Sequence, residues 1–220
     1  MRLLISLLIA FSVSASAKDS KDGFQLRKFE VQKLANGLKV LWLPDASLPY
    51  TSFELMVGAG SAQDPVGKEG LAAFTAGMLE KGTTKRSATQ ISEDLEQMGS
   101  GFDVRVEPDY TTLTASSLSF DRDGLLKNFG EIMLQPSFTN AEIERQRKNT
   151  LASLQKLADH PEQFSEYLVP RFLYGAHPYG HEAVGTPKAI KSLKRVDLQK
   201  FYASNFDPAN AVFAVVGQYD

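Results

Sequence analysis

The sequence predicts an α+β domain in which a mostly antiparallel sheet packs against helices. Segments that read as strands gather early in the chain, and segments with apolar residues at helical spacing gather late. One further apolar segment, residues 211–216, returns as a strand at the end. Strands that come first and helices that follow are typical of a sheet covered by helices rather than of alternating βαβ units.

The first elements are expected to be a β-hairpin followed by further strands. Apolar runs at residues 29–34 and 38–43 flank Asn36-Gly37, a pair that favours the positive φ values of a type I′ turn. Other segments that read as strands, bounded by glycine or proline, are 52–57, 102–106 and 110–118.

The helices are predicted from apolar spacing and from their capping residues. Ser87 and Gln90 form the pattern of a capping box, Thr139 precedes Glu142 in the same pattern, and Pro161 suits a first helical position. The expected helices cover about residues 69–80, 87–98, 123–134, 139–157, 161–174 and 196–203, and a loop is expected from 175 to 187.

The composition excludes several kinds of site. The 220 residues contain no cysteine and three histidines, which removes disulfide scaffolds, Cys-ligated zinc, iron–sulfur clusters and thiol nucleophiles. The net charge is −2 with no basic block, so the sequence does not predict a nucleic-acid partner.

Residues 1–17 are typical of a secretory signal peptide. Arg2 is followed by an apolar stretch over 3–13 and by Ala15-Ser16-Ala17, a small-residue cleavage site. The stretch is shorter than the roughly 20 residues that span a bilayer, and no cysteine follows that could carry a lipid anchor. We therefore expect residues 18–220 to form a single exported domain without a membrane anchor, most simply in a bacterial periplasm.

The histidines offer few ways to build a metal site. His177 and His181 are four residues apart and Glu182 is adjacent, but Pro178 and Gly180 between the histidines argue against a helix. These residues are read as local loop residues, and a relocated zinc site that uses them stays an alternative. His160, which precedes Pro161, is read as a helix-entry residue, and no nucleophile elbow, P-loop or dinucleotide-binding loop is found.

Several blocks together resemble the N-terminal domain of the insulinase/pitrilysin-type (M16) metallopeptidases. They are Leu34 to Val40, Gly58-Ala59-Gly60-Ser61, His177-Pro178-Tyr179-Gly180 with Gly185-Thr186 and Ile190 to Phe201, and Asp207 to Ala211 with Val215-Val216-Gly217. The resemblance covers nearly all of residues 18–220. It implies a LuxS/MPP-like metallohydrolase fold, and it implies that the chain corresponds to the first half of a two-domain protein whose second half is missing here.

The segment Gly70 to Thr83 resembles G-L-A-H-F-L-E-H-M-L-F-K-G-T of active members, in which H-x-x-E-H binds zinc. The three motif positions are occupied by Ala73, Ala76 and Gly77, and the family's third ligand, a glutamate further along, would fall at Ser153. Because alanine and glycine have no donor atoms, the resemblance implies that this chain has no catalytic residues and no zinc.

The resemblance therefore implies a catalytically inactive subunit. It would pair as a heterodimer with an H-x-x-E-H subunit that carries the zinc, and together they would form a peptide-degrading chamber. The strand at 102–106 is a candidate edge for an extended peptide, with Phe102, Asp103, Val104 and Arg105 as candidate binding residues. A structural or assembly subunit without a proteolytic role is the other alternative.

Overall fold

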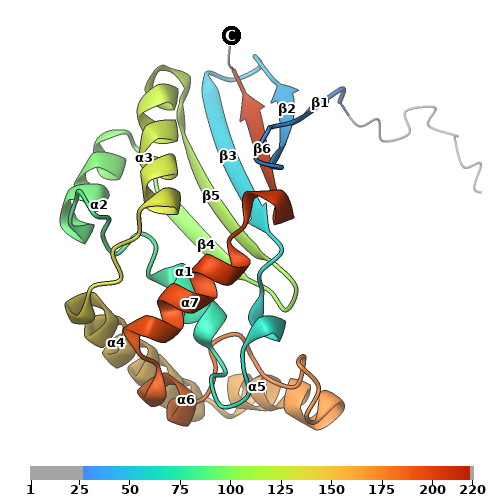
Figure 1. Cartoon of the computed structure of the whole chain (residues 1–220), viewed down its shortest axis with the longest axis vertical. Helices are drawn as coiled ribbons and strands as arrows, with labels where there is room; N and C mark the ends of the chain where they lie inside the picture. The colour runs from blue at the N-terminus through green and yellow to red at the C-terminus, as the bar shows by residue number, and fades with distance from the viewer. Residues whose placement is uncertain (1–26, 219–220) are drawn as a thin grey trace, which may run out of the picture.

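A computed structural model of the chain describes residues 27–218 (Figure 1). The expected signal peptide, residues 1–17, lies outside the described residues. Within residues 27–218, no helix is both long enough and apolar enough to cross a membrane.

Six strands form one sheet in the order β1-β2-β6-β3-β5-β4. Neighbouring strands are antiparallel except β2 and β6, which run parallel, so the expected mostly antiparallel sheet is confirmed. The bounds are β1 Glu30–Lys33, β2 Lys39–Pro44, β3 Tyr50–Val57, β4 Phe102–Val106, β5 Thr111–Leu118 and β6 Ala211–Gly217.

Helices cover one face of this sheet. Burial alternates along β3 and β5, so that Phe53 and Leu113 are buried while Glu54 is exposed on the other face. Phe53 packs edge-on against Phe129 of the covering helix α3 (Arg122–Leu134), with ring centroids 6.3 Å apart. The period-2 pattern of the sequence thus places one side of the sheet in the core and leaves the other side open.

Seven α-helices lie within the described residues (Figure 1). Helices α4, α5 and α6 gather at the end of the molecule opposite the C-terminus, and α1 and α7 cross between them and the sheet (Figure 1). The bounds are α1 Leu71–Gly77, α2 Ala88–Gln97, α3 Arg122–Leu134, α4 Asn140–Ala158, α5 Pro161–Tyr174, α6 Pro187–Ser192 and α7 Arg195–Asn205.

The β1–β2 hairpin is confirmed, but its expected type I′ turn is wrong. That turn needs positive φ at two residues. Gly37 has φ of 91°, whereas Phe138 is the one non-glycine residue with positive φ among residues 27–218. The Gly37 amide donates to the Leu34 carbonyl, and the Leu34 amide donates to the Leu38 carbonyl. The loop therefore has three residues and places glycine at its left-handed position.

The helix expected over 69–80 is shorter at both ends. Gly70 has φ of 97° and cannot be helical, so α1 begins at Leu71. The Asp64 carboxylate accepts hydrogen bonds from the backbone amides of Gly70 and Ala72, at 2.6 and 2.7 Å. It thus provides acceptors for amides at the start of α1 that have no partner within the helix. After Gly77 the chain tightens, because the Leu79 amide bonds to the carbonyl three residues before it.

Helix α6 was not expected, because its residues fall at the end of the predicted loop and just after it. Thr186 caps it by accepting from the Ala189 amide at 3.2 Å, and Pro187 occupies the first helical position. The remaining expected helices are confirmed to within about two residues at each end, which is the usual uncertainty of helix boundaries.

Candidate functional site

A cavity of about 250 Å³ lies where α1, β4 and α4 meet. Ala73 and Gly77 both line it, because residues four apart share one face of a helix. Val104 and Val106 of β4 form a second wall. Phe74, Val184 and Ile190 contribute further apolar lining. The structure thus brings two of the three degenerate motif positions to the wall of one cavity.

Ala76 lies elsewhere on α1. Its side chain is fully buried, with an exposed fraction of 0%, and it does not line the cavity. Ala73 and Gly77 are half-buried instead. If Gly77 carried a Cβ atom, the nearest atom outside its own helix would be the side-chain Nε2 of Gln146 at 3.6 Å, which is an ordinary contact distance. The cavity therefore has room beside Gly77.

The wall formed by α4 consists of Gln146 and Thr150, which the sequence did not single out. Ser153 lies one turn further along the same face, is exposed, and lines a neighbouring groove with Leu154 and His160. Neither Gln146 nor Thr150 has a side-chain hydrogen-bond partner among the described residues. Two polar groups therefore face the cavity without a side-chain hydrogen-bond partner within residues 27–218.

The residues that line the cavity do not fit a zinc ion. Protein zinc sites use cysteine, histidine, aspartate or glutamate, and none of these lines this cavity. Across residues 27–218, no three such side chains lie close enough together to hold a metal. The donor set thus provides neither the ligands nor the general base of an H-x-x-E-H site.

The alternative zinc site at His177, His181 and Glu182 is not supported by the described residues. His177 is exposed, and its Nδ1 accepts from the Tyr179 amide at 3.2 Å. The Nδ1 of His181 lies 3.1 Å from the Glu182 carbonyl oxygen. Burial raises the pKa of the Glu182 carboxyl above its ordinary value. These side chains engage local partners instead of converging on one point.

Strand β4, the candidate peptide-binding strand, is the last strand of the sheet on this side. Val104 faces the cavity and Phe102 lines a second hollow. Asp103 and Arg105 are exposed on the opposite side of the strand, where the Arg105 guanidinium pairs with Glu107 at 2.8 Å. Of the four candidates, only Val104 reaches the cavity. Val106 reaches it too, which the two-residue period of a strand could have indicated.

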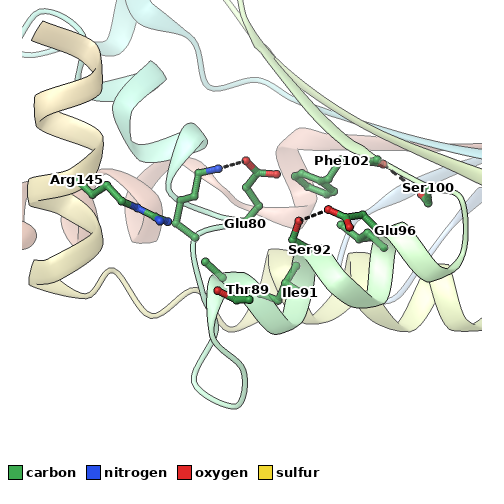
Figure 2. Close-up of a pocket in the computed structure, with 12 residues that line it drawn as sticks. Glu80, Thr89, Ile91, Ser92, Glu96, Ser100, Phe102 and Arg145 are labelled. Carbon is green, nitrogen blue, oxygen red and sulfur yellow. Dashed lines mark hydrogen bonds and ion pairs between the residues drawn. The ribbon is translucent and has the colours of Figure 1, made fainter. Parts of the chain in front are cut away.

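The second hollow, of about 460 Å³, lies at the Phe102 end of β4, between α2 and the residues after α1 (Figure 2). Its charged groups already have partners. Lys81 pairs with Glu80 at 2.5 Å, and Arg145 pairs with Glu142 at 2.5 Å. This hollow is a polar crevice that adjoins the free edge of β4, and it differs in character from the apolar cavity at Val104.

Comparisons with known proteins give a consistent picture. The model of the insulinase family (peptidase family M16) matches residues 39–187. An uncharacterized zinc protease of Rickettsia bellii is 27% identical over 87% of this chain and 47% of its own length. A protein of Arabidopsis thaliana named as a probable mitochondrial-processing peptidase subunit beta is 24% identical over 85% of this chain and 35% of its own length.

Two solved structures are informative. The peptidase M16 inactive domain from Pseudomonas fluorescens has a TM-score of 0.83 at 29% identity, over 88% of this chain and 47% of that chain. The periplasmic protease PqqL from Escherichia coli has a TM-score of 0.79 at 23% identity, over 89% of this chain and 22% of that chain, and shows the fold alone. The chain spans about half the length of the zinc protease of Rickettsia bellii and of the Pseudomonas fluorescens inactive domain.

Proposed function

The chain belongs to the insulinase (M16) family of peptidases, and from that premise we propose that it is a non-catalytic member that binds extended peptides for a zinc-bearing partner. The single observation that carries this proposal is the cavity at Ala73 and Gly77. The fold keeps the helix face and the space, while the lining residues provide no metal ligand.

Catalysis by this chain alone would require a different source of activated water. Zinc peptidases lower the pKa of a bound water and need a base to take its proton. Position 76, where the family has the glutamate base, is an alanine buried away from the cavity. The residues at the three motif positions therefore provide no group that could take up or donate a proton.

The proposed peptide-binding element is the outer edge of β4. Among the described strands, β4 pairs with β5 only, so its other side has backbone groups available to a further strand. An extended peptide can satisfy such groups by adding a strand to the sheet. This proposal keeps Phe102, Asp103, Val104 and Arg105 as the contacting segment, with their backbone as the main source of affinity.

The proposed partner is an M16 subunit with an intact H-x-x-E-H motif, which would carry the zinc and cleave the peptide. Similarity to a domain described as inactive, at 29% identity, supports a non-catalytic role. We further propose that residues 1–17 direct export to the periplasm and that the pair assembles there as a heterodimer. The short, interrupted apolar stretch at 3–13 is the basis for this destination.

The proposal is tested by zinc analysis and a peptidase assay on the chain, on an H-x-x-E-H homologue from the same source, and on their mixture. We expect the chain alone to hold no stoichiometric zinc and to cleave no peptide, and we expect the mixture to exceed the homologue alone. Stoichiometric zinc in the repurified chain, or peptide hydrolysis by the chain alone whether or not a chelator abolishes it, would contradict the proposal. Co-purification without any gain in hydrolysis would favour the structural or assembly alternative.

Restoring the ligands provides a matched control. The variant Ala73→His/Gly77→His/Gln146→Glu places three zinc-binding groups on the same cavity walls. We expect it to bind zinc more tightly than the unaltered chain. Ala203→His, on the exposed surface of α7, controls for zinc bound by any added histidine.

A further inference from the structure

The backbone of β4 alternates between its partner strand and the free edge. The Glu107 amide donates to the Tyr110 carbonyl at the turn between β4 and β5, so this pair is hydrogen-bonded. Bonded and non-bonded pairs alternate along antiparallel strands. In the observed register, Arg105 and Asp103 therefore bond to β5, whereas the amides and carbonyls of Val106, Val104 and Phe102 point outward.

The same three residues direct their side chains toward the helices. Burial along β4 alternates, with Phe102, Val104 and Val106 half-buried and Asp103 and Arg105 exposed. A strand added at this edge would continue the pleat of the sheet, so its residue opposite Val104 would point to the same face as Val104. That face opens on the cavity beside Ala73 and Gly77.

The cavity suits a large uncharged side chain. Its volume is about 250 Å³, and a protein cavity of about 150 Å³ with apolar walls accommodates benzene. No charged residue lines it, so a buried aspartate or lysine would find no compensating charge. Gln146 and Thr150 can still bond to a hydroxyl or to the peptide backbone, because neither has a partner within residues 27–218.

We infer that the space left by the missing zinc ligands is a specificity pocket. It receives the side chain of phenylalanine, tyrosine or leucine from an extended peptide, at the residue opposite Val104 on the outer edge of β4. This inference rests on the proposed peptide-binding function and names its substrate class: extended segments with a large uncharged residue at one register position. In this chain the loss of metal ligands becomes a gain of side-chain selectivity.

The test uses short capped peptides rich in valine and threonine that differ only in one central residue. The central residue is phenylalanine, serine or aspartate, and binding to the unaltered chain is followed by fluorescence anisotropy. We expect the phenylalanine peptide to bind about tenfold or more tightly than the serine peptide, and the aspartate peptide to bind more weakly than both. A phenylalanine peptide N-methylated at alternate backbone positions should lose binding, because it cannot pair with the edge.

Two protein variants locate the effect. Ala73→Leu fills the cavity, so the phenylalanine peptide should fall to the affinity of the serine peptide while the serine peptide is unchanged. Ala203→Leu, an equal change on the exposed surface of α7, should alter neither. The peptide series on the unaltered chain decides the question even where a variant folds poorly.

The outcomes distinguish the specificity pocket from the peptide-binding edge of β4. Equal binding of all three central residues, with loss on N-methylation, would overturn the pocket and leave the peptide-binding edge standing. Failure of every peptide to bind would overturn the proposed function and the pocket with it. A phenylalanine preference that persists in Ala73→Leu would place the selectivity elsewhere and would also overturn the inference.

Discussion

The variant Ala73→Leu also measures whether the cavity is empty in the free protein. Leucine adds three carbons to alanine, and complete burial of each is worth about 0.8 kcal/mol. Because Ala73 is only half-buried and the cavity borders the free edge of β4, we take about half of this sum. The free energy of unfolding should therefore rise by about 1 kcal/mol, which for a chain of this size raises Tm by about 2–4 °C.

The assay is urea denaturation followed by far-UV circular dichroism, with thermal unfolding as a second measurement. Ala72→Leu is the matched control, since Ala72 is adjacent on α1 but fully buried and outside the cavity. Overpacking there should lower the free energy of unfolding by about 1–3 kcal/mol. If Ala73→Leu destabilises the chain as much as Ala72→Leu does, the cavity has no room and the reasoning fails.

Three further predictions concern stability. Burial raises the pKa of Asp64 to about 6, so the folded chain holds this proton more tightly than the unfolded chain does. The free energy of unfolding should therefore fall as pH rises through about 6. Urea denaturation at several pH values between about 5 and about 7.5 should show that this free energy depends less steeply on pH in Asp64→Asn than in the unaltered chain. Arg86 is largely buried and pairs with Glu131 and Asp94. By the same assay, Arg86→Met should lower the free energy of unfolding by about 2 kcal/mol, because the buried carboxylate loses its partner. Arg86→Lys should restore only part of this loss, because an ammonium group lacks the planar geometry of the guanidinium. Ser87→Ala should lower the free energy of unfolding by about 1 kcal/mol, because α2 loses its capping hydroxyl, whereas Ser87→Gly should lower it by only a few tenths. Equal losses of stability in the two variants would argue against a capping role for Ser87.

Local signals predicted most of the elements. Ser87 with Gln90 marks the start of α2, and both reciprocal bonds of the capping box are present. Pro161 begins α5 as expected. These features depend on neighbours within one helical turn, so a single sequence contains them. Helix α6 depends on local signals too, but six residues are too few to show a period.

The residues of α4 that line the cavity could not be predicted from local signals in the sequence. The degenerate positions on α1 follow from the motif, and their side chains share a face because of helix geometry. Which residues of α4 face them depends on how two helices distant in sequence cross. The family resemblance puts the third ligand position at Ser153, which lines a neighbouring groove, while Gln146 and Thr150 of the same helix line the cavity. Tertiary packing decided this, and spacing alone carries no information about it.

The position of β6 has a consequence for the order of assembly during synthesis. Strands β2 and β3 are not neighbours; each pairs with β6, the last of the described strands in chain order. Until residues 211–217 have been made, the β1–β2 hairpin and the β3-β5-β4 group can only be two separate pieces with open edges. Joining them closes a loop of more than half the chain, a long-range contact of the kind that slows folding. A product truncated before Ala211 would keep both open edges and would be exposed to aggregation and to proteolysis.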